Sequence, residues 1–297
     1  MTLGSILLIA NPAAGRGRVH RILPEIQAAC RSMGIAFDLK YTEAPNHATE
    51  IAREASRQGY GLVAAVGGDG TVSEAGAGLV GSDTPLALLP AGTGNDFARV
   101  LGLHRNLPLA LRALREGSIR SIDAGRFGPH FFLNSVGVGF DGLVAYSNRE
   151  IRRLRGFLSY FVVVLRHLPT YRNPSFTLRG RDWIHRGKGM MVEVGNGKCA
   201  GGGILLTPDA DLHDGMLDIA FLGDYGPIRR FVTLPSFFFR RIDSIGGCRL
   251  FRTDVLSISV DRPLYIHVDG NVHRMNEPFT AEVIPSALRV LFPPVAP

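Results

Sequence analysis

The sequence has few cysteines and lacks the long apolar runs of a membrane-spanning chain. Its 297 residues include only three cysteines, Cys30, Cys199 and Cys248, and no two of them have the spacing of metal ligands. An odd, widely spaced set excludes a disulfide framework and is typical of a reducing compartment. No apolar stretch reaches the roughly 18 residues that span a bilayer. The apolar run 3–10 has no basic residue before it, so it predicts a first strand and not a signal peptide.

Two further absences narrow the function. The sequence contains no internal repeat. It also has no Gly-x-x-x-x-Gly-Lys-Ser/Thr loop, and this absence argues against a P-loop enzyme. Hydrophobic residues make up 45% of the sequence and charged residues 20%, as in ordinary globular proteins. The formal net charge of +7 suits nucleic acid, an anionic lipid surface or a phosphorylated substrate, and leaves the choice open.

The first part of the chain alternates strands and helices. Apolar strand-like runs at 6–10, 36–41, 62–66 and 86–89 are separated by helical patterns at 19–33, 47–57 and 72–80, with a short one at 96–101. This order predicts a parallel sheet with helices on both faces. Beyond residue 120, strand-like runs separated by turns predict a mainly antiparallel, β-sandwich-like domain, interrupted by helical insertions at about 148–168 and 226–242. We therefore expect an α/β nucleotide-binding domain over 1–125 and a β-rich domain over 126–297, whose last strand is a candidate to return to the first domain.

The most informative motif is Gly-Gly-Asp-Gly-Thr at residues 67–71, directly after a buried strand. Glycines let backbone N–H groups approach phosphate oxygens, and a following helix adds its positive end. The carboxylate of Asp69 would repel a phosphate group unless it holds a metal ion or takes a proton. Its presence among the glycines therefore indicates phosphoryl transfer. Thr71 and Glu74 match a helix-capping box, so capping is a competing explanation for Glu74.

Two other glycine turns follow strands. Residues 11–18 contain Asn11, Gly15 and Arg16, which suit either a phosphate loop or a solvated turn. Residues 89–99 read Leu-Pro-Ala-Gly-Thr-Gly-Asn-Asp-Phe-Ala-Arg, in which Thr93 could contact a nucleotide, while Asn95 and Asp96 occupy positions typical of helix caps. Because the carboxyl ends of parallel strands share one edge, the three turns are expected to gather there.

Other acidic residues are candidate metal ligands, each with a structural alternative. Asp123 could complete a Mg²⁺ shell or sit in a salt bridge, and the acid-rich residues 209–218 could hold a structural Mg²⁺ or form an Asp-Gly hairpin. Residues 137–142 match the letters of a dinucleotide fingerprint without its context, and are interpreted as tight packing.

Two basic, apolar segments are candidate membrane contacts. Residues 152–167 place Leu154, Phe157, Leu158, Phe161, Val162 and Leu165 at helical spacing beside arginines, and Phe231 with Phe237 to Arg241 is similar in character. Docking on an anionic bilayer competes with ordinary core-facing helices that have basic outer faces.

Together these residues resemble the soluble diacylglycerol kinase catalytic-domain family, which includes bacterial lipid kinases and the sphingosine and ceramide kinases. The resemblance rests on Asn11-Pro12 with Gly15, residues 67–71, residues 92–99, Gly201 to Gly203, Pro208 and Asp214-Gly215. It implies an α/β domain followed by a β-sandwich-like domain, and an ATP- and Mg²⁺-dependent kinase acting on a lipid at the membrane surface. It implies a cytoplasmic, transiently membrane-associated protein with no nucleic-acid partner, and leaves a homodimer open.

The resemblance also assigns roles to residues. It places ATP on Asn11, Gly15, Thr42, Gly67, Gly68, Gly70, Thr71, Glu74, Gly92, Thr93 and Asn95. It places catalytic Mg²⁺ on Asp69, Asp96 and Asp123, and a structural Mg²⁺ on Asp211, Asp214 and Met216, partly through carbonyls.

One position departs from the family pattern. Where the family has Asp-Gly-Glu, this chain has Asp269-Gly270-Asn271, and asparagine cannot accept a proton at neutral pH. Either Asp269 or Asp69 serves as the base, or turnover is weak, or the chain is a non-catalytic binding relative. General-base help contributes roughly 100- to 10,000-fold, so its loss would slow an enzyme without erasing binding. An NAD kinase, which shares Gly-Gly-Asp-Gly-Thr, is a third reading that residues 92–99 do not favour.

Overall fold

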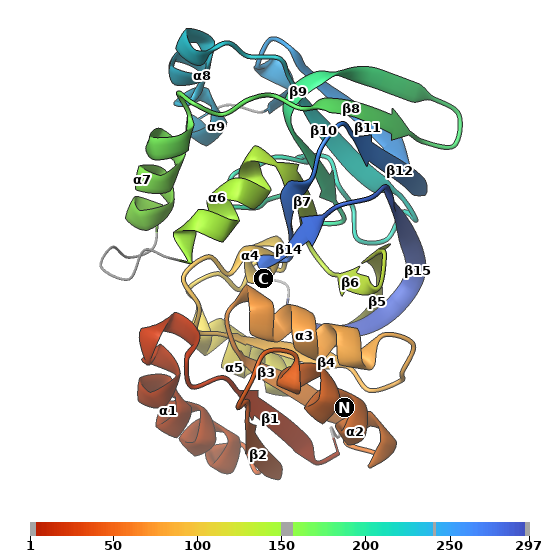
Figure 1. Ribbon diagram of the computed structural model, residues 1–297. Coiled ribbons are helices and arrows are strands. Elements are labelled where there is room, and N and C mark those ends of the chain that lie inside the picture. Colours follow the sequence, from red (N-terminus) through yellow and green to blue (C-terminus); the bar gives the residue numbers. More distant parts are fainter. Residues whose placement is uncertain (1–3, 150–156, 240–241, 295–297) are drawn as a thin grey trace. The chain divides into compact units, whose positions relative to one another are not determined.

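The computed structural model describes residues 4–149, 157–239 and 242–294 (Figure 1). The chain divides into two compact units. Unit 1 comprises Met1–Ala124 and Pro285–Pro297, and unit 2 comprises Gly125–Ile284. The chain therefore passes from one unit to the other twice.

Unit 1 is built on a parallel sheet in the order β4-β3-β1-β2. Its strands are β1 (Ile6–Ala10), β2 (Phe37–Tyr41), β3 (Leu62–Gly67) and β4 (Leu86–Pro90). Every residue of β1, β3 and β4 is buried, and such continuous apolar strands are typical of a parallel sheet covered on both faces. This confirms the α/β fold predicted for the first part of the chain.

Six helical segments connect the strands of unit 1 in the described residues. They are η1 (Ala14–Arg16), α1 (Arg18–Ser32), α2 (His47–Arg57), α3 (Asp69–Leu79), α4 (Asp96–Val100) and α5 (Leu107–Glu116). Helix α5, which sequence reasoning missed, begins where the Asn106 side chain accepts a hydrogen bond from Leu109 N–H at 3.0 Å.

The start of α3 corrects one expectation. The helix begins at Asp69 with Gly68 as its N-cap, three residues before the predicted start at 72. Thr71 is therefore inside the helix, where its hydroxyl accepts a 3.0 Å hydrogen bond from the Asn11 amide. The capping-box explanation for Glu74 is wrong, because Thr71 is not the cap.

The end of the chain completes unit 1. In β15 (Phe279–Phe292), Val290 pairs with Leu86 in parallel, and the Ala287 carbonyl accepts a 2.8 Å hydrogen bond from Gly81 N–H. Within the same strand Ser286 has a φ of 51°, and its N–H donates to Asp123 Oδ1 at 2.8 Å. Asp123 is buried in β5 (Ser118–Phe127). Its carboxylate thus binds β15 at Ser286, where the backbone of that strand departs from extended geometry.

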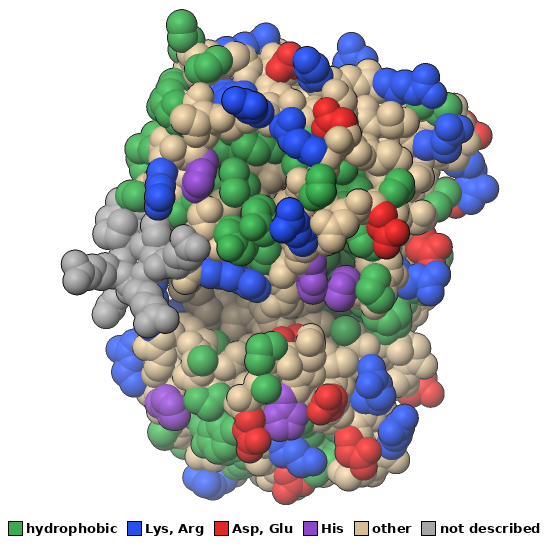
Figure 2. Space-filling view, in the orientation of Figure 1, with side chains coloured by type: hydrophobic (Ala, Val, Ile, Leu, Met, Phe, Trp, Pro, Cys, Tyr) green, Lys and Arg blue, Asp and Glu red, His purple; other side chains and the backbone are tan. Residues whose placement is uncertain are grey.

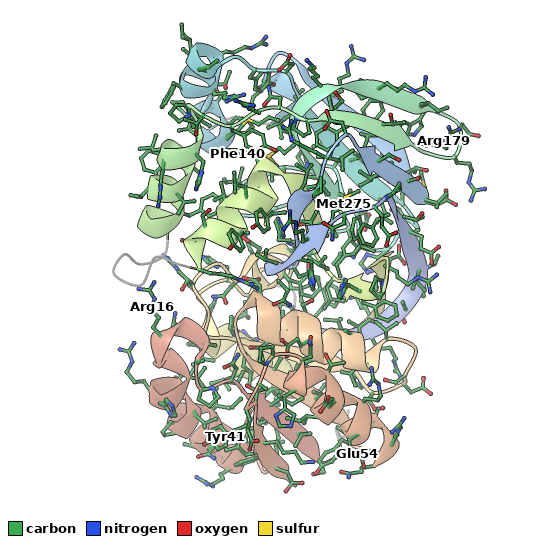
Figure 3. All side chains as sticks on the ribbon, viewed as in Figure 1. Arg16, Tyr41, Glu54, Phe140, Arg179 and Met275 are labelled. Atoms are coloured by element: carbon green, nitrogen blue, oxygen red, sulfur yellow. The ribbon has the colours of Figure 1, made fainter. Side chains whose placement is uncertain are left out.

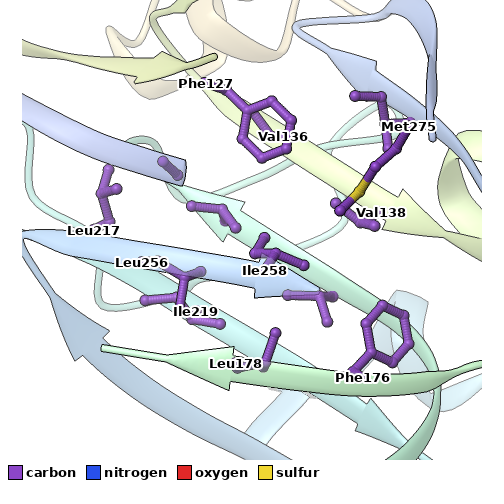
Figure 4. Close-up of a cluster of buried hydrophobic side chains, with 14 of the residues drawn as sticks. Phe127, Val136, Val138, Phe176, Leu178, Leu217, Ile219, Leu256, Ile258 and Met275 are labelled. Carbon is purple, nitrogen blue, oxygen red and sulfur yellow. The ribbon is translucent and has the colours of Figure 1, made fainter. Parts of the chain in front are cut away.

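Unit 2 is a mainly antiparallel β structure, which confirms the β-sandwich-like class predicted for the second domain. Strand β9 (Ile184–Gly195) is its longest internal strand and pairs with three neighbours, β7, β8 and β10. The strands other than β5, β9 and β15 are β6 (His130–Phe132), β7 (Ser135–Gly139), β8 (Ser175–Arg179), β10 (Leu217–Gly223), β11 (Cys248–Thr253), β12 (Val255–Val260), β13 (Leu264–Val268) and β14 (Asn271–Met275). Buried side chains from several of these strands, among them Phe127, Val192, Ile219 and Ile258, form one core cluster of unit 2 (Figure 4).

Helices of unit 2 lie beside this β structure (Figure 1). They are α6 (Phe140–Asn148), α7 (Phe157–His167), α8 (Pro227–Thr233) and α9 (Ser236–Phe239), followed by η2 (Ile242–Ser244). Helix α6 was not predicted. Of the predicted basic clusters, Arg152, Arg153, Leu154, Arg155, Arg240 and Arg241 lie outside the described residues, as do the side chains of Phe157, Leu158, Phe238 and Phe239. Within the described part of the chain, no helix is both long and apolar enough to cross a bilayer.

Candidate functional site

Unit 1 brings the three glycine turns into direct contact. The Gly67 carbonyl accepts hydrogen bonds from Ala91 N–H at 2.7 Å and from Gly92 N–H at 3.2 Å. A Cβ on Gly92 would lie 2.4 Å from Gly68 Cα, and a Cβ on Gly15 would lie 2.0 Å from the Ala91 carbonyl oxygen. These distances are too short for any side chain at Gly15 or Gly92, so both glycines are required for the turns to pack.

Asp69 lies among these turns. Its Oδ1 accepts a hydrogen bond from Phe97 N–H, at the start of α4, at 3.3 Å. A Cβ on Gly94 would lie 2.9 Å from Asp69 Oδ2 and 3.6 Å from Asp96 Oδ2, so both carboxylates flank the same glycine. Two acidic oxygens beside a backbone cradle form a donor set that suits Mg²⁺, which prefers oxygen ligands.

Asn11 connects the first turn to the second. Its amide nitrogen donates to Thr71, and its amide oxygen accepts from Ala13 N–H at 3.0 Å. Arg16, at the end of η1, is exposed and has a φ of 54° (Figure 3). Thr42 extends the β1–β2 pairing, with its N–H donating to the Ala10 carbonyl at 2.9 Å, so it lies next to the residue that precedes Asn11.

The third turn is shaped by Asn95 in a way that sequence did not predict. Asn95 occupies the N-cap position of α4 with a φ of 52°, but its side chain makes no capping hydrogen bond to the helix. Instead its amide donates to the Gly92 carbonyl at 2.9 Å, which closes the turn. Thr93 between them is exposed, as a ligand contact requires.

The remaining predicted nucleotide residues have plainer settings. Gly70 lies in the first turn of α3, and a Cβ on Gly67 would collide with the Thr71 side chain at 2.4 Å. Glu74 accepts a 2.8 Å hydrogen bond from the Thr49 hydroxyl through its backbone carbonyl. That bond fixes α3 against α2 through the Glu74 backbone, and the nucleotide contact expected of the Glu74 carboxylate stays a prediction.

Asp269 and Asn271 belong to one β-hairpin of unit 2. Val268 pairs with Asn271, and the intervening Asp269 and Gly270 have φ values of 46° and 82°, the pattern of a type I′ turn. The Asp269 carboxylate is buried, and its Oδ1 accepts from Asn134 N–H at 3.0 Å and from Ser135 N–H at 2.8 Å. Oδ2 accepts from Leu133 N–H at 2.7 Å. The carboxylate therefore anchors the β6–β7 connection.

A buried polar group that sequence reasoning missed lies next to this hairpin. His267 Nε2 is hydrogen-bonded to Asp141 Oδ2, and the Tyr160 hydroxyl donates to Asp141 Oδ1. Glu193 is buried beside them, and one ligand atom from each of Asp141, Glu193 and His267 lies within 4.8 Å of the others. The signal in the sequence was Asp141 inside Gly-Phe-Asp-Gly, where an acid is unexpected in tightly packed glycines.

The charges of this group stabilise one another. Burial alone lowers the pKa of His267, but the adjacent Asp141 carboxylate, together with the charges of Glu193 and Asp269, outweighs burial and raises the pKa to about 9. Burial alone raises the pKa of Asp141, but the His267 charge and the hydrogen bonds from His267 and Tyr160 bring it below its ordinary value. Close packing explains the glycines of residues 137–142, because a Cβ on Gly137 would lie 2.4 Å from His267 Nε2 and one on Gly142 would lie 2.1 Å from the Tyr265 carbonyl oxygen.

The same group borders an apolar pocket. The pocket has a volume of about 60 Å³ and is lined mainly by side chains from α6, α7, β9, β10, α8 and α9. Its apolar lining includes Phe140, Val164 and Leu222, and its polar lining includes Asp141 and Tyr160. Phe140 marks its place at the start of α6 in Figure 3.

The acid-rich turn before β10 is held by its own contacts. Asp211 Oδ1 accepts from His213 N–H at 3.1 Å, and Asp214 Oδ1 accepts from Met216 N–H at 3.0 Å. Asp214 Oδ2 forms an ion pair with Arg252, whose Nε also lies 3.4 Å from Asp218 Oδ2. The carboxylates expected to hold a structural Mg²⁺ are thus already engaged with protein donors, and that site stays a prediction.

Comparison with known proteins gives matches along nearly all of the chain. Residues 5–127 match the diacylglycerol kinase catalytic domain, and residues 134–292 match the YegS C-terminal NAD kinase beta sandwich-like domain. A "Probable lipid kinase YegS-like" of Pseudomonas putida is 32% identical, over 90% of this chain and 89% of that protein. One of the same description from Citrobacter koseri is 30% identical, over 100% and 98% of the two chains.

Solved structures share the fold. A crystal structure of a diacylglycerol kinase from Bacillus anthracis strain Sterne has a TM-score of 0.76 at 22% identity and covers 99% of this chain and 98% of that one. A second crystal structure from the same organism, described as "a putative diacylglycerol kinase", is 23% identical, covers 99% of both chains and has a TM-score of 0.82. The chain belongs to the diacylglycerol kinase catalytic domain family, with an N-terminal α/β catalytic domain and a C-terminal YegS-type beta sandwich-like domain.

Proposed function

We propose that the protein is an ATP- and Mg²⁺-dependent lipid kinase that phosphorylates a hydroxyl of diacylglycerol or a related lipid. One observation carries the proposal: in unit 1 a carboxylate, Asp69, lies inside a cradle of packed glycine turns. A cradle that a single Cβ would fill suits phosphate oxygens, and the carboxylate distinguishes phosphoryl transfer from storage of a nucleotide.

The reaction breaks the bond between the γ-phosphorus of ATP and the oxygen that bridges to the β-phosphate. The lipid hydroxyl oxygen forms the new bond to phosphorus, ADP leaves, and the hydroxyl proton passes to a base. Backbone N–H groups of the turns at 11–17, 67–71 and 92–95 would bind the phosphates, with Thr42 and Thr93 next to the nucleotide. Because this transition state is loose, alignment and charge neutralisation matter more than a strong base.

Asp96 is the residue that we assign to the metal, and Asp69, across Gly94 from it, keeps its carboxylate for the hydroxyl proton. Their oxygens flank Gly94, and Mg²⁺ bound by Asp96 would neutralise phosphate charge. Asp123 is occupied by Ser286 N–H through one oxygen, so any part it takes in holding the ion would use the other oxygen. The turn with Asp211, Asp214 and Met216 is proposed to have only a structural part, and Arg252 balances the charge of Asp214 there.

The acceptor is proposed to be a lipid on two grounds. The relatives above are described as lipid kinases, and unit 2 holds an apolar pocket that reaches the polar pair Asp141 and Tyr160. Lipid chains fit an apolar pocket, and a polar end suits a headgroup.

Asp69 is our candidate for the proton acceptor. Asp269 accepts three backbone hydrogen bonds that the β6–β7 connection needs, whereas Asp69 lies within the glycine cradle itself, across Gly94 from Asp96. Asn271 supports a second candidate function, a nucleotide- and lipid-binding relative with weak or no turnover. An NAD kinase stays a weaker alternative, favoured only by residues 67–71 and the name of the beta sandwich-like domain.

The test is transfer of label from [γ-³²P]ATP to mixed lipids, compared with transfer to NAD. Wild-type protein should label a chloroform-extractable product in a Mg²⁺-dependent reaction. Asp69→Asn should lower the rate at least about 100-fold, since it removes the group that accepts the hydroxyl proton. Asp83→Asn, at an exposed carboxylate of the same unit, is the matched control. Labelled NADP, or undiminished activity of Asp69→Asn, would overturn the proposal.

A further inference from the structure

Helix α8 of unit 2 buries a charged side chain and exposes apolar ones, the opposite of the usual arrangement on a protein surface. Of its two arginines Arg230 is buried, with 5% of its surface exposed, while Ile228 and Val232 are 83% and 71% exposed. Phe231 is 44% exposed on the same short helix. Single exposed apolar residues are common, but three on one short helix that buries one of its two arginines form a patch that calls for a partner.

The orientation of α8 is fixed by Arg230. Its Nε donates to the Tyr225 carbonyl at 2.8 Å, and its Nη1 donates to the carbonyls of Leu168 and Tyr171, both at 2.8 Å. Its Nη2 donates to Asn173 Oδ1, also at 2.8 Å. A buried guanidinium with four acceptors holds the helix firmly, so rotation that would hide Ile228 and Val232 breaks these bonds.

Helix α7 extends the apolar surface. Val162 and Leu165 are each 37% exposed, while Val163, Val164 and Leu168 are buried. Residues of α7 and of α8 line the same apolar pocket, so the two helices lie together at its walls. Hydrophobic side chains line the edge of the molecule over α7 and α8 in the space-filling view (Figure 2).

The chain segments that form this surface carry positive charge and no negative charge between the acidic residues that bound them. The sequence has no acidic residue between Glu150 and Asp182, nor between Asp224 and Asp243, the two stretches that contain α7, α8 and α9. Arg166 and Arg229 are exposed in them. An apolar surface whose own helices carry arginines and no acidic residue complements an anionic bilayer, whose headgroups attract arginine while its interior accepts the apolar side chains.

We propose that Ile228, Phe231 and Val232, with Val162 and Leu165, form a docking surface for an anionic lipid bilayer. Docking here would present the helices that wall the apolar pocket to the membrane. The proposal rests on the proposed function for its biological meaning, but binding to vesicles is measured without ATP and stands on its own.

The experiment is co-sedimentation of the full chain with vesicles of phosphatidylcholine alone or with phosphatidylglycerol. Wild-type protein should bind the anionic vesicles, and binding should weaken as salt rises because the arginine contribution is screened. The double variant Ile228→Ser with Val232→Ser should bind at least about tenfold more weakly, since two exposed apolar anchors are lost. Ile184→Ser is the control, because Ile184 is 51% exposed on β9, outside the proposed surface.

Three measurements make the outcome decisive. Thermal unfolding should be the same for the double variant and wild type, since both positions are exposed. Phosphorylation of a short-chain, water-soluble diacylglycerol should persist in the double variant while phosphorylation of vesicle lipid falls. Equal vesicle binding by wild type and the double variant would overturn the docking surface. So would loss of a dimer in the double variant without loss of vesicle binding, which would make this face a contact between copies. Absence of any lipid phosphorylation by wild type would overturn only the kinase assignment.

Discussion

Asp269 Oδ2 accepts a 2.7 Å hydrogen bond from the backbone N–H of Leu133, although 136 residues separate them in the sequence. With the bonds from Asn134 and Ser135, this contact ties the β13–β14 hairpin to the connection between β6 and β7. Asp269 therefore stabilises the fold of unit 2, a role that the Asp-Gly-Asn motif in the sequence does not indicate.

Replacing Asp269 by asparagine should destabilise unit 2. Asparagine tolerates the positive φ of 46° as well as aspartate does, so the change isolates the carboxylate. An amide offers one acceptor oxygen in place of two and sets its NH₂ group against a backbone donor. We expect the free energy of unfolding to fall by about 1–3 kcal/mol, measured by urea denaturation. Unchanged stability together with lost activity would instead make Asp269 a catalytic group.

Replacing Asn271 by glutamate should raise turnover if proton removal limits the rate. Asn271 begins β14 directly after the turn, and glutamate there supplies the carboxylate that the family pattern has at this position. We expect kcat in the lipid-kinase assay to rise at least about tenfold, a fraction of what a general base can contribute. Asn271→Gln, which adds length without charge, is the control and should leave kcat unchanged. An unchanged rate in Asn271→Glu would show that another base already suffices.

Replacing Gly92 by alanine should damage the nucleotide cradle. The added Cβ would lie 2.4 Å from Gly68 Cα and 2.7 Å from Asn95 Oδ1, so the turns must separate. We expect a loss of about 1–3 kcal/mol of stability and a higher KM for ATP. Alanine at Gly226, where nothing lies within 4 Å of the new Cβ, is the control for stability. A normal KM for ATP would place the nucleotide elsewhere.

The His267–Asp141 pair should make stability depend on pH on the alkaline side. The pKa of His267 is raised to about 9 in the folded protein, above the roughly 6.5 of an unfolded chain. The stabilisation it gives is therefore complete below about pH 6.5 and is lost as the pH rises toward 9. Asp141, whose pKa is lowered, contributes above its ordinary value and loses that contribution only in acid.

Melting curves from pH 6 to 10 check this prediction. Wild-type protein should lose stability between pH 6.5 and 9, while His267→Gln should start lower and show a flatter profile. His20→Gln, at an exposed histidine of α1, should follow wild type. Parallel profiles for wild type and His267→Gln would show that the pair does not hold its charge.

The sequence predicted the α/β order of unit 1 because its strands are continuous apolar runs that end in glycine turns. It also predicted that the turns would gather, since parallel strands end at one edge, and the Gly15–Ala91 and Gly68–Gly92 contacts bear this out. It misplaced the start of α3, because the Phe97 N–H bond to Asp69 and the Asn11 bond to Thr71 come from distant segments. Local helix propensity cannot register such contacts.

The buried group in unit 2 lay beyond sequence reasoning for the same reason. Asp141 and His267 are 126 residues apart, and each alone resembles an ordinary polar residue near a strand end. Only the pairing of β13 with β7, which sets His267 opposite Gly137, brings the imidazole onto the carboxylate. A strand pairing of that range has no short-range signal.

The double passage of the chain between the units has a practical consequence for dissection. A fragment that stops at Ala124 lacks Val290, which pairs with Leu86, and Ser286, which satisfies the Asp123 carboxylate. Such a fragment would expose a bare edge of β4 and invite aggregation. A soluble nucleotide-binding half would need residues 285–294 supplied as well, either as an added peptide or by circular permutation.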